Sequence, residues 1–417
     1  MRVKLLTDKI IKILVWQTDF PYDKVDSSMT KQKKVKKEKK KKDRTHLIVK
    51  EEPLGGMTLL NIWRLLWIGR FRVHPKYWLR FIYAYGLCLV TWPLRVIEWL
   101  AVTRKVKKTK VKTDPLFVIG HYRTGTTYLM TLLAYDKSKG YCSNLEGYVP
   151  HYFITFHGFT KKLIDASLPE TRPMDDVIMG SDEPTEEEYA IGAMSKYGFY
   201  NGFIFPKKFK HFSKYNAIAD HYKEKDVKKW RKVYEFFVKK LTLKYNGKML
   251  ILKNPAITYK IKLILKMYPN AKFIHTYRDP YTLYASTLRF FREVFAIYAV
   301  QTWKDEDLQQ GIIGNYREMY EKFKETRKLI PEDRIIDIKY EDFIKDPLPH
   351  LKRIYTDLKI DGFDEYKDKF AKYVKSQADY KTGKHVISDD IIKIVNDNWD
   401  FIREMQGYEK LEPKSKK

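Results

Sequence analysis

A short stretch near residue 120 most constrains what this 417-residue chain can fold into. Four apolar residues, Leu116 to Ile119, stop at Gly120, and a polar segment containing Gly125 leads into an apolar run at helical spacing. This pattern predicts a strand, a glycine-bearing loop and the first turn of a helix. Such a loop directs several backbone N–H groups to one point, at the positive end of the helix dipole. The stretch therefore predicts a binding site for a phosphate or another oxyanion.

The spacing of these glycines fits that of a nucleotide-hydrolysing P-loop except at one position. A P-loop carries a lysine directly after its second glycine, where the lysine reaches the terminal phosphates. Thr126 occupies that position here, and the cation of the loop, Arg123, lies earlier. The loop therefore suits an anion but lacks the lysine used with Mg-ATP. On local sequence alone, the alternative is a plain strand–turn–helix in which the glycines serve only the turn.

The segment GHYRTGTTYL, residues 120–129, resembles the 5′-phosphosulfate loop of sulfotransferases. That loop surrounds the sulfate donor 3′-phosphoadenylyl sulfate (PAPS). The arginine at position 123 makes the segment more similar to the broad sulfotransferase family than to the cytosolic aryl and steroid enzymes, which carry lysine there. The resemblance implies PAPS as donor, PAP as product and no metal. It also implies donor contacts from His121, Arg123, Thr124, Gly125, Thr126 and Thr127.

A second segment extends the resemblance to the other end of the donor. The predicted strand that begins at Ala271 runs into Arg278-Asp279-Pro280, and Ser286 follows eight residues after Arg278. In sulfotransferases, the arginine at this strand exit and the serine on the next helix bind the 3′-phosphate of PAPS. A guanidinium binds phosphate through two parallel hydrogen bonds, and a hydroxyl adds a further donor. The resemblance therefore assigns Arg278 and Ser286 to the donor site.

Sulfuryl transfer to an alcohol or amine needs a base for the acceptor proton, and two glutamates are candidates. The segments RPMD (172–175) and PTEEEYA (184–190) resemble two motifs of the family, although Thr and Glu replace Gln and Asp in the second. Under that alignment Glu186 and Glu188 coincide with family glutamates. A carboxylate serves as a base when desolvation raises its pKa, whereas an acidic run can also merely stabilise a helix N-terminus. We favour Glu186 and add Arg123 to the predicted catalytic residues.

Three further residues are candidates for contact with the donor or the acceptor. Lys253 and Asn254 follow the predicted buried strand 249–252, at the strand end where open α/β sheets bind ligands. The family carries Lys-Asn-Pro there, and the alternative is a surface lysine beside an Asn-Pro turn. His151 belongs to a Pro-His-aromatic pattern that also resembles the family. It is either an acceptor contact or a structural histidine.

The first 112 residues differ in character from the rest. Residues 1–45 contain the run KQKKVKKEKKKKDR and are predicted to form a basic, largely disordered tail with one amphipathic helix. Residues 46–112 are rich in Trp, Leu, Ile and Tyr, and their charge-free run 81–94 is shorter than the roughly 20 residues that span a bilayer. We expect helices that lie in a membrane interface. The alternatives are a helical hairpin packed on the catalytic core or on a second subunit, and a single-span anchor.

Four predicted strands, the last at 334–339, each lead into a helix. This alternation predicts an α/β domain over residues 113–417, with a central parallel sheet covered on both faces. The resemblance implies a P-loop NTPase-like three-layer sandwich that follows a hydrophobic helical extension. The net charge of +29 favours anionic partners such as a nucleotide or an acidic membrane surface. Two cysteines, Cys88 and Cys142, fit a reducing compartment.

Together these features predict a sulfotransferase that passes a sulfuryl group from PAPS to a hydroxyl or amine. The aromatic N-terminal region suggests a lipid or another amphipathic acceptor. We expect the cytoplasm or the cytoplasmic face of a membrane and no specific nucleic acid, and a homodimer is compatible with the sequence. Two alternative functions are compatible with the sequence. One is a P-loop kinase of a small metabolite, and the other is a non-catalytic adaptor that binds membranes or nucleic acid through the lysine run.

Overall fold

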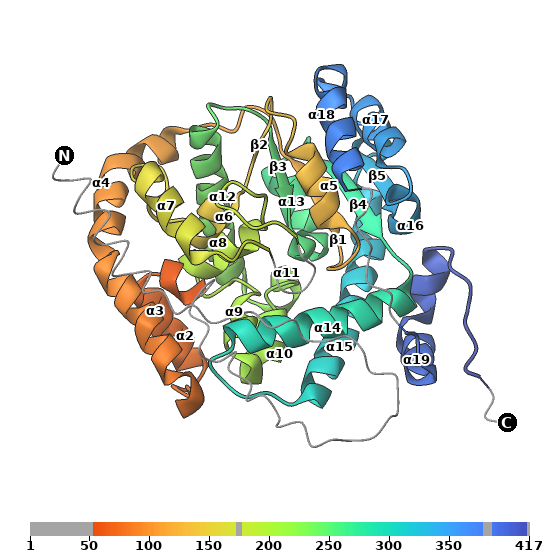
Figure 1. Ribbon diagram of the computed structural model, residues 1–417, viewed down its shortest axis with the longest axis horizontal. Coiled ribbons are helices and arrows are strands. Elements are labelled where there is room, and N and C mark those ends of the chain that lie inside the picture. The colour runs from red at the N-terminus through yellow and green to blue at the C-terminus, as the bar shows by residue number, and fades with distance from the viewer. Residues whose placement is uncertain (1–52, 172–176, 378–385, 415–417) are drawn as a thin grey trace.

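The computed structural model describes residues 53–171, 177–377 and 386–414 (Figure 1). A five-stranded parallel sheet lies at its centre, with strand order β2-β3-β1-β4-β5. The four predicted strands are all present, and the edge strand β2 is too short for any periodicity to predict it. The strands are β1 (Leu116–Gly120), β2 (Gly140–Tyr141), β3 (Leu250–Lys253), β4 (Lys272–Tyr277) and β5 (Ile335–Lys339).

Successive residues of β1 belong to two different apolar clusters, so helices cover both faces of the sheet. Leu116 and Val118 pack with α5 (Thr126–Leu133), α17 (Pro347–Asp357) and α18 (Phe363–Ser376). Phe117 and Ile119 pack on the other face, with α12 (Glu224–Lys244), α13 (Ile261–Met267), α14 (Pro280–Tyr298) and α15 (Asp305–Thr326). The predicted three-layer α/β architecture is confirmed.

The strand register brings the carboxyl ends of β1, β3 and β4 to one edge of the sheet. Val118 pairs with Lys253, and Gly120 pairs with Thr276. The chain passes from β3 to β4 across β1, so the strand order reverses at β1. Ligands of open α/β sheets bind in the crevice at such a reversal. The three predicted site segments follow these strand ends directly and therefore meet there.

Among the described residues, three α-helices precede the sheet and lie along one flank of the molecule (Figure 1). They are α2 (Leu59–Ile68), α3 (Trp78–Val90) and α4 (Trp92–Lys108), and we call them the extension. The prediction of a hydrophobic helical extension is confirmed. In the described part of the chain no single helix is long and apolar enough to cross a bilayer. Residues 75–90 and 92–108 meet that criterion only together, as a pair bent by 43°.

The inner face of the extension is continuous with the core of the rest of the chain. Its buried side chains Leu65 and Cys88 belong to the same apolar cluster as Phe117 of the central sheet. At Gly56 a Cβ atom would lie 1.7 Å from the carbonyl oxygen of Tyr148, so the backbones of the two parts are in direct contact.

Buried polar contacts also join the extension to the rest of the chain. Glu98 on α4 forms an ion pair with Lys240 on α12, and both side chains are almost fully buried. Arg80 on α3 donates to the carbonyl groups of Ile297 and Ala299, at the end of α14. The predicted tail 1–45 and the RPMD segment lie outside the described residues.

Candidate active site

The loop between β1 and α5 has an unusual backbone conformation. Gly120, Arg123 and Gly125 have φ angles of 129°, 69° and 84°. A non-glycine residue with positive φ costs on the order of 1 kcal/mol or more and concentrates at functional sites. A Cβ at Gly125 would lie 2.6 Å from the ring of Tyr340, so space as well as φ requires glycine there. Helix α5 begins directly after this loop, which therefore lies at the positive end of a helix dipole.

Arg123 in this loop contacts Ser286 and Arg278, two residues from a segment more than 150 positions further along the chain. Nε of Arg123 donates to the hydroxyl of Ser286 on α14 at 3.1 Å. Nη1 of Arg278 donates to the carbonyl oxygen of Arg123 at 3.0 Å. The guanidinium of Arg278 also lies 4.2 Å from the ring centre of Tyr340. The structure thus brings together the residues that the sequence assigned to the two ends of one donor.

The environment of Arg278 leaves part of its guanidinium unsatisfied. The residue is 9% exposed, and among the described residues its Nε has no hydrogen-bond partner. Burial lowers the pKa of Arg278, and the neighbouring charge of Arg123 lowers it further. Because both effects disfavour the charged form, a bound anion would stabilise this pair of cations.

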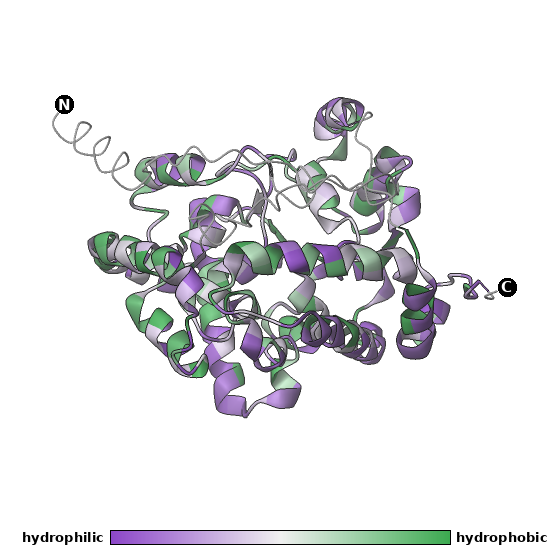
Figure 2. Ribbon diagram, turned by 60° about the horizontal axis from the view of Figure 1, so that its bottom comes forward, coloured by the Kyte–Doolittle hydropathy of each residue, from purple (hydrophilic) through white to green (hydrophobic). Residues whose placement is uncertain are grey.

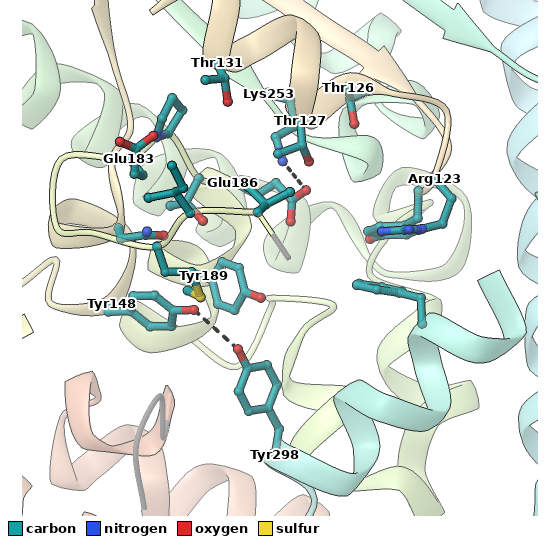
Figure 3. A pocket seen from close by; sticks show the side chains of 18 residues that line it. Arg123, Thr126, Thr127, Thr131, Tyr148, Glu183, Glu186, Tyr189, Lys253 and Tyr298 are labelled. Carbon is teal, nitrogen blue, oxygen red and sulfur yellow. Dashed lines mark hydrogen bonds and ion pairs between the residues drawn. The ribbon is translucent and has the colours of Figure 1, made fainter. Parts of the chain in front are cut away.

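A cleft of about 800 Å³, including its open mouth, lies beside the loop (Figure 3). In Figure 3, Arg123 lies on one side of the cleft and Glu186 lies across from it, close to Lys253; Thr126 and Thr127 lie along the top of the view. The aromatic side chains in the lining are Tyr122, Tyr148, Tyr189, Phe290 and Tyr298.

Glu186 is the candidate base that lines the cleft. It directly precedes α8 (Glu187–Met194) and forms an ion pair with Lys253, the last residue of β3. The hydroxyl of Tyr200 donates to its other carboxylate oxygen. The side chain of Lys253 is 2% exposed and that of Glu186 is 14% exposed, so the pair is largely shielded from solvent. The sequence singled out both residues but not their contact.

Glu188 and Asn254 lie inside the fold instead. The Glu188 carboxylate accepts the N–H of Phe199 at 2.6 Å and the side-chain amide of Asn254 at 3.1 Å. The amide oxygen of Asn254 in turn accepts the N–H of Ala256 at 2.9 Å. Neither side chain lines the cleft. Of the two glutamates that the sequence left open, Glu186 lines the cleft and Glu188 does not.

The glutamate between them, Glu187, is fully buried. It accepts a hydrogen bond from the hydroxyl of Tyr234 at 2.9 Å. Burial raises the pKa of Glu187 to about 7. Because it does not line the cleft, this raised pKa bears on the stability of the fold near neutral pH.

Three other predicted contacts also point away from the cleft. The hydroxyl of Thr124 donates to the carbonyl of His121 at 2.7 Å and lies 2.7 Å from the hydroxyl of Thr276, which stabilises the loop. Burial lowers the pKa of His121 to about 3, so the ring is neutral at pH 7. His151 lies 3.4 Å from the carbonyl of Ala193, and burial lowers its pKa to about 3 as well. None of the three lines the cleft.

The sequence reasoning missed several aromatic residues of the site. Tyr200 belongs to a segment in which no local pattern indicates chemistry, yet its hydroxyl contacts Glu186. Phe290 lies one helical turn after Ser286, and its ring centre is 5.7 Å from the guanidinium carbon of Arg123. That four-residue spacing was an available signal, because side chains one turn apart share a helix face. The described residues contain no cluster of three or more His, Cys, Asp or Glu placed to hold a metal ion.

Comparison with known proteins agrees with this geometry. A family model described as "Sulfotransferase family" matches residues 115–365. The chain belongs to the sulfotransferase family. The matched residues include the loop, the Glu186–Lys253 pair and the segment from Arg278 to Ser286.

Mycobacterial sulfotransferases are among its relatives. The chain is 29% identical, over 350 residues, to the omega-hydroxy-beta-dihydromenaquinone-9 sulfotransferase Stf3 of Mycobacterium bovis and of Mycobacterium tuberculosis. The match covers 84% of this chain and 89% of the relative. Among solved structures, sulfotransferase STF9 from Mycobacterium avium matches with a TM-score of 0.61 at 15% identity, over 98% of this chain and 97% of that one. Sulfotransferase STF1 from Mycobacterium tuberculosis matches with a TM-score of 0.57 at 18% identity, over 83% and 88%. These structures support the fold.

Proposed function

We propose that this sulfotransferase takes its sulfuryl group from PAPS and transfers it to the hydroxyl of an amphipathic, lipid-like acceptor. The observation that carries the proposal is the meeting of Arg123, Ser286 and Arg278 at one edge of the sheet. Two neighbouring guanidinium groups beside a helix N-terminus suit a ligand with two anionic ends. PAPS is such a ligand.

Each end of the donor has its own set of residues. Arg123 and the backbone N–H groups of residues 125–127 would hold the phosphosulfate end. Arg278 and Ser286 would hold the 3′-phosphate. The buried Nε of Arg278 has no hydrogen-bond partner among the described residues, which supports an additional anionic contact there. Thr124 and His121 contribute through the loop, whose shape their hydrogen bond fixes.

The residues of the cleft can promote an in-line displacement. The acceptor oxygen attacks sulfur while the bond from sulfur to the leaving phosphate oxygen breaks, and PAP departs with the bonding electrons. Glu186 takes the acceptor proton. Arg123 and the loop amides stabilise the charge that develops on the leaving phosphate. The ammonium of Lys253 adds positive charge beside Glu186.

The far side of the cleft supports an amphipathic acceptor. A second, smaller cavity shares Tyr189 and Tyr298 with the cleft, so these two rings separate the two spaces. Apolar side chains, including Met57, Phe203 and Ile204, line it. The Stf3 relatives are named for a hydroxylated menaquinone as acceptor. A hydroxyl in the cleft with an apolar body toward the second cavity fits this arrangement.

The proposal is tested by supplying sulfur-labelled PAPS and a membrane extract to the purified protein. We expect label in an organic-soluble product, and about 10²–10³-fold slower labelling with the Arg123→Ala variant. In parallel, PAP should raise the melting temperature, whereas Mg-ATP should not, because the loop lacks a lysine after Gly125. Stabilisation by Mg-ATP with no effect of PAP would favour the kinase alternative instead.

A further inference from the structure

The extension carries an unusual concentration of exposed apolar side chains. Of the large apolar side chains that are exposed in the described residues, thirteen lie between Leu60 and Leu100, and six lie elsewhere. The most exposed include Trp67 at 75%, Leu100 at 67%, and Ile82 and Trp99 at 64% each. Monomeric soluble proteins rarely expose a contiguous apolar patch of this kind unless it binds a partner. The exposed apolar side chains of the extension therefore indicate a binding surface.

Each helix of the extension has one face on the protein and one face in solvent. On α3, Trp78, Ile82 and Leu89 are exposed at helical spacing, whereas Arg80 and Cys88 are buried on the opposite face. On α4, Glu98 is buried while its neighbours Trp99 and Leu100 are exposed. In Figure 2 this flank, at the left, shows hydrophobic stretches along its outer helices. The helices therefore lie flat against the protein with an apolar stripe turned outward.

The charges of this surface have one sign. Between residues 53 and 113 the sole carboxylate is Glu98, which is buried and paired with Lys240. The exposed charged residues in this part are all cations, among them Arg64, Arg70, Arg72, Lys76, Arg104 and Lys105. Tryptophan and arginine around an apolar stripe suit the interface of a bilayer, where the ring or the stem is buried and the polar end stays in water.

A second copy of this chain fits the surface less well. Joining two copies through this face about a two-fold axis would bring the same cations together with no exposed carboxylate to pair with them. An anionic lipid surface attracts each cation instead, by roughly fivefold in affinity per lysine or arginine. The basic run at residues 31–44 precedes the extension along the chain and adds charge of the same sign.

We propose that the outward face of α2, α3 and α4 docks on an anionic lipid bilayer, with the helices lying in the plane of the interface. Docking needs no sulfuryl transfer, so it stands apart from the proposed reaction. It would also bring a bilayer close to the second cavity, because Pro53 and Met57, which directly precede α2, line that cavity. An acceptor dissolved in the bilayer would then approach the cleft from the side of Tyr189 and Tyr298.

The test measures co-sedimentation of the full-length protein with vesicles, without PAPS or acceptor. Wild-type protein should bind phosphatidylcholine–phosphatidylserine vesicles more tightly than pure phosphatidylcholine vesicles, and added salt should weaken the binding. The decisive variant, W67S/I82S/W99S, removes one exposed apolar side chain from each helix of the extension. It leaves every cation in place, including the run at residues 31–44. We expect it to bind the mixed vesicles at least about tenfold more weakly.

A matched control, L329S/V386S/M405S, removes three exposed apolar side chains outside the extension and should bind as wild type does. Both triple variants should keep the wild-type circular dichroism spectrum and melting temperature, since the replaced side chains are exposed. The variant R64Q/R70Q/R72Q should weaken binding to the mixed vesicles by on the order of a hundredfold.

Three outcomes would overturn the proposal. The first is wild-type protein that binds neither type of vesicle, or binds both equally. The second is a W67S/I82S/W99S variant that binds the mixed vesicles as wild type does. The third is that light scattering shows a dimer for wild type and a monomer for W67S/I82S/W99S, while the variant still binds vesicles. That result would show that the face is a subunit interface.

Discussion

The guanidinium of Arg123 lies 3.1 Å from the hydroxyl of Ser286, although 163 residues separate them in the chain. The parallel pairing of β1 with β4 produces this contact, because both residues follow strands that end at the same edge of the sheet. The same edge receives Lys253 from the end of β3. One register therefore places the β1–α5 loop and the Glu186–Lys253 pair around one cleft, with Arg278 packed against the loop.

Replacing Arg123 with alanine should lower the rate of sulfate transfer by about 10²–10³-fold, because a preorganised donor to the leaving phosphate is lost. The measurement is the initial rate with saturating PAPS. Arg289→Ala is a suitable control, since Arg289 lies on α14 close to Ser286 but its side chain is 52% exposed and pairs with Glu293. Wild-type rates in the Arg123 variant would remove this residue from the mechanism.

Replacing Arg278 with alanine should weaken the binding of PAP by roughly 10- to 100-fold, the range for a hydrogen bond to a charged group. Isothermal titration calorimetry measures this directly. The PAP affinity of Arg278→Lys should lie between those of wild type and the alanine variant, because lysine keeps the charge but cannot form the two parallel hydrogen bonds of a guanidinium. An unchanged PAP affinity in the alanine variant would place the 3′-phosphate elsewhere.

The two glutamates should separate catalysis from folding. Glu186→Gln should reduce turnover by about 10²–10⁴-fold, the usual contribution of a general base, with PAP affinity near wild type. Glu188→Gln should instead destabilise the fold by about 1–3 kcal/mol, because Glu188 accepts two buried hydrogen bonds. Rate and melting temperature are measured for both variants. If the Glu188 variant lost turnover without losing stability and the Glu186 variant did not, the base would be Glu188.

Glu187 should make the stability of the protein depend on pH. Burial raises its pKa from 4.5 to about 7 in the folded state, so the unfolded chain ionises first as the pH rises. The contribution of Glu187 to the free energy of unfolding is therefore fully present below pH 4.5 and is lost progressively as the pH rises toward 7. At about 1.4 kcal/mol per pKa unit, the loss approaches about 3 kcal/mol.

Urea unfolding gives the free energy of unfolding of wild type and of Glu187→Gln at pH 5 and at pH 7. The change between the two pH values in wild type, minus the same change in the variant, is the loss due to Glu187. The glutamine still accepts from Tyr234 but cannot ionise, so the variant should lose less stability than wild type between the two values. Subtraction cancels the contributions of the histidines, which are the same in both proteins. An identical pH dependence in the two proteins would contradict the raised pKa.

Much of the loop that we propose for the donor could be predicted because it is local in sequence. A strand, a loop and a helix in succession identify Arg123 and residues 125–127, and the same pattern recurs around Arg278. The direction of side chains could not be predicted in this way. Thr124 and Asn254 belong to recognisable segments, but tertiary packing turns both into the fold.

The acceptor side was largely unpredictable for a related reason. Tyr189, Tyr200 and Tyr298 come from α8, the segment after it and the end of α14, and each looks like an ordinary core aromatic in the sequence. They meet only because the helices around the cleft pack on one another. The choice between Glu186 and Glu188 likewise depends on which way each carboxylate turns at the start of α8, and periodicity carries no such information.

Because the extension and the central sheet share one apolar core, removal of the extension should affect folding of the rest of the chain. A fragment that starts at residue 113 would uncover the apolar surface now covered by Leu65 and Cys88 and would leave Lys240 without its buried carboxylate partner. Such a fragment should be recovered only as insoluble aggregate, whereas one that starts at residue 46 should remain soluble. Family similarity begins at residue 115, but we expect the smallest unit able to fold to begin well before it.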